Sequence, residues 1–482
     1  MKSTALGVVL IALVGSTACN VNAGFSPTTV PFCGGAHGTL QVLCAITIPG
    51  SPLVSGGKGW IDPSTNDYYY DDQSNNSVDI VNAQTFTYVG RVPGFVGAAT
   101  GASGGTITYG GGTATSNGQG PNSIVPTGNG TVWISDGNAN VQVVNISSMT
   151  IVKTISTAMT SGAYQCDGGT ATTHFCGRTN EMTYDPNDQI IMVETPNPLS
   201  YAYCSNPATA AACATAAAIS YPTTTPLTMP SYATFINAST YAILGQISFT
   251  DVAGTTEAPV WDAAVGGTGR FLVPVPSCSA GFVGTTCSSA ANGATQYVAV
   301  IDPKNLAQYA GTYSAATAIA GSTPYAIPNC TALGSAGNTG MINDMTLDSA
   351  DQTVIMPACG HEVVFNAMNG TVLNGAVISQ VGSSDETSFN KADGNFYVVA
   401  TVPTGLSGAG AAALGQISGK TGNWIQNVAN PAGKDPAGDG NNNRVFTFVT
   451  VTAAQAAAGN DSTACAQFGY KGIGCITVFG QN

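Results

Sequence analysis

Seven polar residues stand directly before short apolar runs along this chain, and all but one of them are acidic. They are Asn122, Glu181, Glu257, Asp344, Asp385, Glu386 and Asp439. Carboxylate and amide oxygens are the ligands that a hard cation such as Ca²⁺ prefers, and Ca²⁺ takes about six to eight of them. If the apolar runs are strands that bring these side chains together, the sequence predicts a metal or ligand site, with Ca²⁺ as the indicated ion.

A second interpretation of the same seven residues is structural. Asp, Asn and Glu side chains before a strand also cap turns by accepting hydrogen bonds from nearby backbone N–H groups. The chain has only 25 Asp and Glu residues among 482. Their concentration at corresponding positions favours a functional site, although both interpretations stay open at this point.

Other catalytic chemistry has little support in the sequence. The three histidines are His37, His174 and His361. None has an evident partner for general-base or metal-binding work, so structural roles are expected. No Cys-x-x-Cys-His segment encodes a c-type haem. GAGAAA (408–413) and SGKTGN (418–423) lack the strand–turn–helix context of a nucleotide site, and GASGG (101–105) lacks the context of a nucleophile elbow. We therefore expect no haem and no nucleotide.

Composition limits the class of protein. Charged residues make up 8% of the chain, the net charge is -13, and there are 60 glycines. Nucleic-acid binding needs a basic surface, which 12 Lys and Arg residues do not supply. Few basic groups would also limit positive self-repulsion in an acidic medium. One interpretation is therefore an exported protein of an acid-living bacterium.

The N-terminus resembles a bacterial signal peptide. Met1 and Lys2 form a short basic start, and residues 5–14 are apolar. We expect cleavage after Ala23, so that residues 1–23 are the signal peptide, and the alternative is a lipid anchor at Cys19. No later segment has 18 uninterrupted apolar residues, so no transmembrane segment is expected. The predicted location is secreted or periplasmic.

Twelve cysteines remain when Cys19 is set aside, and they fall into neighbouring pairs. The pairs are Cys33 and Cys44, Cys166 and Cys176, Cys204 and Cys213, Cys278 and Cys287, Cys330 and Cys359, and Cys465 and Cys475. Zinc sites usually have two to four residues between cysteines, and no pair has such spacing. Local disulfides formed in an oxidising compartment are the simplest prediction, although sequence cannot prove the pairing.

The elements that must position these residues come from an internal repeat. Residues 68–92 and 131–155 align without a gap, with Tyr70 opposite Trp133 and Asn82 opposite Asn145. Each contains three apolar runs separated by polar turns, and a further short run precedes each. Asn, Asp and Gly between apolar runs indicate hairpins. The unit is therefore a four-stranded antiparallel meander.

Recurrence of such a meander predicts the blades of a β-propeller. Residues 297–313 are expected to supply the third and fourth strands of one blade. The last blade is expected to begin at residues 441–451 and to take its outer strand from residues 39–50, because closing the ring removes an exposed edge. The prediction is an all-β fold, a single seven-bladed propeller over residues 24–482. Its approximate blades are 58–95, 121–158, 179–250, 257–314, 339–380, 384–430, and 437–482 with 38–50.

The stretch TVWISDGNANVQVVNISSMTIVKTI (131–155) resembles the YVTN-type β-propeller repeat, related to NHL-repeat and SMP-30-like propellers. SMP-30-like propellers hold a metal with acidic and Asn side chains at the channel, so the resemblance also implies Ca²⁺. Members of such families act as binding, scaffold or surface proteins, and related propellers include lactonases. Fold alone does not decide among these functions.

Three functions follow as hypotheses. The first is an exported, disulfide-stabilised module that binds a small ligand, a metal or an envelope protein without catalysis. The second is a metal-dependent, lactonase-like hydrolase that uses the carboxylates at the channel mouth. The third is a structural protein of the envelope or of a biofilm.

Overall fold

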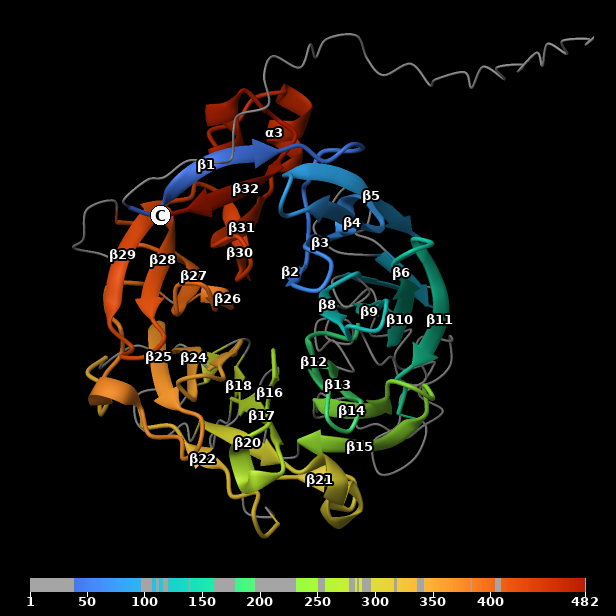
Figure 1. Cartoon of the computed structure of the whole chain (residues 1–482), viewed down its shortest axis with the longest axis vertical. Helices are drawn as coiled ribbons and strands as arrows, with labels where there is room; N and C mark the ends of the chain where they lie inside the picture. Colours follow the sequence, from blue (N-terminus) through green and yellow to red (C-terminus); the bar gives the residue numbers. More distant parts are fainter. Residues whose placement is uncertain are drawn as a thin grey trace, which may run out of the picture.

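The structure is a computed structural model in which seven small β-sheets stand in a ring around a common axis (Figure 1). It describes residues 39–96, 120–137, 139–159, 178–195, 231–249, 256–276, 296–315, 319–335, 342–382, 384–403 and 409–481, and four short strands between them. The signal-peptide prediction for residues 1–23, the lipid anchor at Cys19, His37 and His174 lie outside the described residues. Helices in the described part are short, and none could span a membrane.

The blades are numbered along the chain. Blade 1 contains β2 (Gly59–Asp62), β3 (Asp67–Asp72), β4 (Ser77–Asn82) and β5 (Thr87–Pro93). Blade 2 contains β8 (Ser123–Pro126), β9 (Thr131–Asp136), β10 (Asn140–Asn145) and β11 (Thr150–Ser156). Blade 3 contains β12 (Met182–Asp185), β13 (Ile190–Thr195), β14 (Tyr232–Asn237) and β15 (Ile243–Phe249). Blade 4 contains β16 (Val260–Asp262), β17 (Arg270–Val275), β20 (Tyr297–Ile301) and β22 (Tyr325–Ala326).

The remaining blades complete the ring. Blade 5 contains β23 (Thr346–Asp348), β24 (Thr353–Ala358) and β25 (His361–Asn366), with isolated bridges from Val372 and Ile378 at its outer edge. Blade 6 contains β26 (Ser384–Asn390), β27 (Asn395–Thr401), β28 (Ala412–Ser418) and β29 (Trp424–Ala429). Blade 7 contains β30 (Gly433–Asp439), β31 (Arg444–Val449), β32 (Cys475–Gly480) and the N-terminal β1 (Gln41–Ile46). Outside the ring, β6 (Thr106–Tyr109) pairs with β7 (Gly112–Thr115), and β18 (Phe282–Val283) with β19 (Thr286–Cys287).

The apolar core lies between neighbouring blades. Successive side chains of a strand point to opposite faces of its sheet. Tyr68 and Tyr70 therefore pack toward blade 7, where Tyr68 stacks on Phe446 with 5.1 Å between ring centroids, while Tyr69 packs toward blade 2. Each neighbouring pair of blades shares a buried cluster of this kind. Strands buried on both faces explain the continuous apolar runs of the sequence.

The N-terminal strand closes the ring, as predicted. β1 pairs antiparallel with β32, from Gln41 opposite Gly480 to Ile46 opposite Ile476. In Figure 1 this blue strand lies beside the red C-terminal strand, so that the two ends of the chain share one sheet. The predicted all-β, seven-bladed architecture is confirmed.

The ring has two unlike faces, because every inner strand runs in the same direction across it. We call the face where inner strands begin, at Lys58, Asn122 and Glu181, the loop face. We call the opposite face, where they end at Asp62 and Asp185, the turn face. On the turn face the Asp carboxylates accept backbone N–H bonds two residues on, such as Ser64 N to Asp62 Oδ1 at 2.8 Å. Most of the long connections start and end at the loop face, and the long connection after β20 starts at the turn face.

Two predicted strands differ from the structure. After β20, the turn from Asp302 is too long for a hairpin and forms the 3-10 helix η3 (Pro303–Tyr309). The following β21 (Thr312–Tyr313) then pairs in parallel with β15 of blade 3, where the buried ring of Tyr313 packs on Phe249. Residues 297–313 therefore do not complete blade 4, and β22 takes the outer position instead.

The last blade also begins earlier than expected. Its inner strand is β30, from Gly433 to Asp439, so residues 440–443 form the turn after that strand. The Asn-rich segment that was expected to begin the blade is equivalent to the Pro-Ser-Thr-Asn turn after Asp62. Asp439, which was predicted to precede the inner strand, is therefore the last residue of that strand and lies at the opposite face of the ring.

Two of the predicted disulfides lie wholly within the described residues and are confirmed. They are Cys330–Cys359 and Cys465–Cys475. Cys44 is also disulfide-bonded, and its partner lies outside the described part of the chain. Cys33, Cys166, Cys176, Cys204, Cys213 and Cys278 lie outside it as well, and only the backbone strand is described at Cys287.

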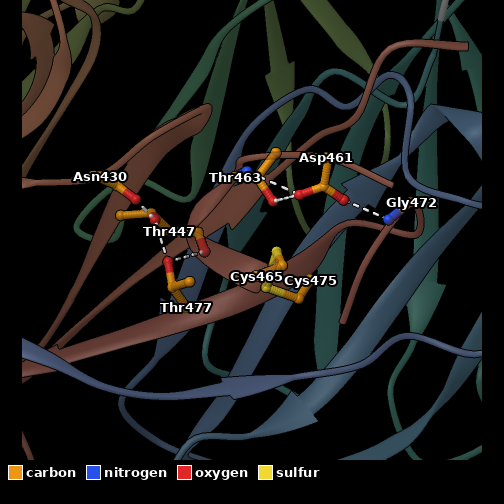
Figure 2. The surroundings of a disulfide bond; sticks show 8 residues. All are labelled: Asn430, Thr447, Asp461, Thr463, Cys465, Gly472, Cys475 and Thr477. Carbon is orange, nitrogen blue, oxygen red and sulfur yellow. Dashed lines mark hydrogen bonds between the residues drawn. A yellow bond between two sulfur atoms is a disulfide. The ribbon is translucent and has the colours of Figure 1, made fainter. Parts of the chain in front are cut away.

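The Cys465–Cys475 bond holds the insertion between β31 and β32 (Figure 2). This insertion contains α3 (Ala453–Ala458) and η6 (Ala464–Phe468). Asp461 accepts hydrogen bonds from Thr463 N at 2.8 Å and from Gly472 N, which ties the middle of the insertion to its C-terminal end. Burial acts to raise the pKa of Asp461, but the hydrogen bonds from Thr463 and Gly472 together outweigh it and hold that pKa below its usual range.

We expect the double replacement Cys465→Ser, Cys475→Ser to lower the free energy of unfolding by about 2–3 kcal/mol, because the bond closes a short loop. The replacement Cys330→Ser, Cys359→Ser should cost more, since its loop is longer, with a sequence separation of 29 against 10. Guanidinium unfolding of the two variants measures both losses. An unchanged free energy in both would contradict the expectation.

Candidate functional site

The most unusual polar group on the loop face is the ammonium of Lys58, which lies just before β2. Its Nζ is 2.6 Å from Glu386 Oε2, 3.1 Å from Glu181 Oε2 and 3.2 Å from Asp344 Oδ1. The Lys58 side chain is only 9% exposed. One buried cation therefore faces three carboxylates.

These four residues come from four different blades. Lys58 precedes the inner strand of blade 1, Glu181 that of blade 3 and Asp344 that of blade 5, and Glu386 lies at the start of β26 in blade 6. Asp344 is held further by Thr387 N, which donates to its Oδ2 at 2.8 Å. The inner strands surround the axis, so residues at their starting ends converge there. We call these four residues the axial cluster.

Amide side chains extend the axial cluster around the ring. Gln73 Nε2 donates to Asn122 Oδ1 at 3.4 Å, and Asn122 Nδ2 donates to Asn180 Oδ1 and, at 3.4 Å, to Glu181 Oε1. Asn180 Nδ2 in turn donates to Glu257 Oε2. This series of side-chain hydrogen bonds thus runs from blade 1 to blade 4, and it fixes the orientation of each amide.

Burial and mutual repulsion dominate the electrostatics of the cluster. Burial raises the pKa of Asp344 to about 6, with Lys58 acting in the opposite direction. Burial, then Asp344 and Glu181, raise the pKa of Glu386 well above its usual range. Burial would lower the pKa of Lys58, but its three carboxylate neighbours raise it well above the ordinary value. Lys58 is therefore charged, and the cluster holds protons that exposed carboxylates would have lost.

Two further carboxylates adjoin the axial cluster. Asp71 Oδ2 accepts from the Lys58 backbone N–H at 3.3 Å, and burial followed by the charge of Glu181 raises its pKa. Burial followed by the charge of Asp385 raises the pKa of Asp435. Asp385 itself is exposed. It is the member of this group that faces solvent most openly.

Of the seven residues predicted from sequence, the structure brings six to the loop face. Asn122, Glu181, Glu257, Asp344 and Glu386 are linked by the contacts above, whereas the charge of Asp385 acts on them through its effect on the pKa of Asp435. Asp439 does not join them. It ends β30 at the turn face, where it accepts from Asn441 N at 2.9 Å and Asn442 Nδ2 at 2.8 Å. For Asp439 the turn-capping interpretation holds.

Sequence reasoning missed Lys58, Asp71, Asn180 and Asp435. Lys58 stands immediately before β2, as Asn122 stands before β8 and Glu181 before β12. A search of that position for every polar type, rather than for acids and amides, would have found it. Asp435 was missed because the inner strand of blade 7 was placed too late. Asp71 is the penultimate residue of β3, the second strand of blade 1, and no repeat marks that position.

The described residues do not fit a calcium ion as they are arranged. Among them, no group of three or more His, Cys, Asp or Glu side chains is placed to hold a metal. The Lys58 ammonium lies where a cation shared by Glu181, Asp344 and Glu386 would have to lie. The His361 side chain is engaged with the backbone, since its Nδ1 is 2.8 Å from the Val381 carbonyl oxygen.

Comparisons with known proteins assign no family to this chain. No protein-family model matches the chain, and no curated protein matches it in sequence. A solved structure described as "Structure of U3-55K" is similar over 92% of this chain and 99% of that one, with a TM-score of 0.48 and 6% identity. This likeness says nothing about activity. Membership of the YVTN or NHL families stays a prediction.

Proposed function

We propose that this chain is an exported, non-catalytic binding module whose ligand site is the axial cluster and the polar residues around it on the loop face. Its export is supported by the disulfides, which persist in oxidising compartments. Its secreted or periplasmic location belongs to the same proposal. Binding residues of rigid scaffolds are commonly carried by the face with the long loops, which here is the loop face.

The observation that carries the proposal is the convergence of Glu181, Asp344 and Glu386 on the buried Lys58. Buried ion pairs are weak contributors to stability, because desolvation offsets the attraction, and well-packed apolar residues often serve as well. The stability of the fold therefore does not explain why charged side chains from four blades meet at the axis. Perturbed, clustered titratable groups are typical of functional sites.

A thermal-shift panel of purified protein tests this proposal. The panel contains calcium chloride, sugars, polyols, amines, amino acids and lactones. At least one compound is expected to raise the melting temperature of the wild type, and Glu386→Gln should weaken that effect. Asp351→Asn is the matched control, because it removes an exposed carboxylate on the turn face. If no compound shifts the wild type, or if both variants respond alike, the axial cluster is not a ligand site.

The same samples discriminate the hydrolase hypothesis. A metal-dependent, lactonase-like enzyme would carry bound metal and consume lactone. Elemental analysis and lactone hydrolysis are expected to be negative. Bound metal, together with lactone hydrolysis that is lost in Glu181→Gln, would reject the non-catalytic binding module in favour of the hydrolase.

A further inference from the structure

We propose that the axial cluster forms an amide bond within the chain, between Lys58 Nζ and the side-chain carboxyl of Asp344. Such a bond is a covalent modification that the protein completes on itself after folding, because only the closed ring brings the two residues together. It goes beyond the proposed binding function and does not depend on it, since it requires no ligand. The contacts of Lys58, Asp344, Glu386 and Thr387 carry the proposal.

The two reacting groups are held in contact inside the protein. Lys58 Nζ lies 3.2 Å from Asp344 Oδ1, and the two side chains are 9% and 1% exposed. Groups fixed at contact distance react far faster than the same groups free in solution, because the entropy of encounter has already been lost. Burial also keeps out bulk water, which would otherwise reverse the bond by hydrolysis.

Glu386 is placed to move protons between the two groups. Lys58 rests as an ammonium, and only a neutral amine attacks a carboxyl, so a proton must first leave Nζ. Glu386 Oε2 lies 2.6 Å from Nζ, and the Glu386 carboxyl also hydrogen-bonds the Asp344 side chain. Burial, then the charge of Asp344, raises the pKa of Glu386 well above its usual range. A carboxyl in contact with both reactants can accept a proton from Nζ and donate one to Oδ1.

Thr387 holds the other oxygen of Asp344. Its backbone N donates to Asp344 Oδ2 at 2.8 Å, and its Oγ1 donates to the same oxygen at 3.3 Å. When an amine adds to a carboxyl carbon, negative charge develops on the oxygen that remains, and donors already aimed at that oxygen stabilise it. Oδ2 is therefore the oxygen that stays, and Oδ1, which faces Lys58 and Glu386, is the one that leaves.

The reaction is a condensation that needs no oxidant and no further reactant. One proton leaves Nζ through Glu386, and the Nζ lone pair forms a bond to the Asp344 carboxyl carbon. A second proton leaves Nζ by the same route, and both protons reach Oδ1. The bond from the carboxyl carbon to Oδ1 breaks, Oδ1 departs as water, and Oδ2 becomes the amide oxygen. Glu386 ends as it began. The product is neutral, so one buried positive and one buried negative charge disappear, and burying charge is costly.

The bond joins two blades that are distant in sequence. Lys58 and Asp344 are 286 residues apart, so the amide closes a long loop of chain from blade 1 to blade 5. A cross-link that closes a long loop restricts the unfolded chain strongly. Blades 1 and 5 therefore stay tied together even when the pairing of β1 with β32 opens.

Mass spectrometry of the purified full chain, after reduction of its disulfides, tests the bond. The wild type is expected to be lighter than its sequence by the mass of one water, and proteolysis should yield a branched peptide that joins Lys58 to Asp344. Lys58→Arg keeps the positive charge but cannot form the amide, so it should have its full mass. Glu386→Gln should form the bond about a hundredfold more slowly. Lys304→Arg is the matched control, since Lys304 is 49% exposed in an ordinary ion pair, and it should lose one water like the wild type.

Three results would overturn the amide bond. They are a wild type at its full mass, a loss of water that persists in Lys58→Arg, or a branched peptide that joins Lys58 to a residue other than Asp344. The wild-type mass decides even if a variant does not fold. The proposed binding function fails or stands separately, because the thermal-shift panel measures the response to added compounds and the mass measures only the chain.

Discussion

The melting temperature is expected to rise when the pH is lowered from about 8 to about 5, the reverse of ordinary acid denaturation. Burial raises the pKa of Glu194 and Glu362 to about 8, and burial with the neighbouring Asp79 raises that of Asp72 to about 8. In the unfolded chain these groups would titrate near their ordinary values of 4.5 and 3.8. The folded state therefore binds more protons than the unfolded state between these limits.

The direction in which stability changes with pH follows from this difference in bound protons. A carboxyl whose folded pKa is raised contributes its full stability below the unfolded pKa and loses it as the pH rises toward the folded pKa. Each such group changes the free energy of unfolding by about 1.4 kcal/mol per pH unit within the window. Asp461 acts in the opposite direction, because its pKa is lowered, but its effect is confined to more acidic conditions.

Isosteric amides test the cause. Glu194 accepts from Thr256 Oγ1 at 2.6 Å, and Glu362 accepts from Ser384 N at 2.7 Å. A Glu194→Gln, Glu362→Gln variant keeps an acceptor oxygen and cannot ionise, so its melting temperature should depend less on pH. Thermal melts followed by circular dichroism measure both proteins. A wild type that melts higher at pH 8 than at pH 5 would refute the expectation.

Replacement of Lys58 by Met is expected to lower the free energy of unfolding by about 3–5 kcal/mol at neutral pH. Lys58→Met leaves Glu181, Asp344 and Glu386 buried without their shared counter-ion. The loss should shrink as the pH falls, because protonated carboxyls no longer need a cation. Urea unfolding at two pH values measures both effects.

Lys304→Met is the matched control for Lys58→Met. Lys304 pairs with Asp188 at 2.9 Å, but its side chain is 49% exposed. Exposed ion pairs contribute little to stability, because water screens the two charges, so this variant should unfold almost like the wild type. Equal losses in the two variants would mean that the axial cluster is no more important than a surface ion pair.

Local signals in the chain were sufficient for the fold. Alternating and continuous apolar runs, such as the three tyrosines of β3, report strands buried on both faces, and Asn- and Asp-rich turns report hairpins. Those features involve neighbours a few residues apart, and they repeat. The prediction failed where a turn departed from the repeat, at η3 after Asp302, since an edge strand can pair with either neighbouring blade.

The candidate site depended on information that no local pattern contains. Lys58 and Asp344 are 286 residues apart, and they meet only because the ring closes. The assignment of Asp439 and Asp435 depended on where β30 begins, because opposite ends of one inner strand lie on opposite faces of the ring. Residue types therefore indicated which side chains could bind a cation. Only the tertiary arrangement placed an ammonium of the chain itself among them, since charge compensation acts through space and not along the sequence.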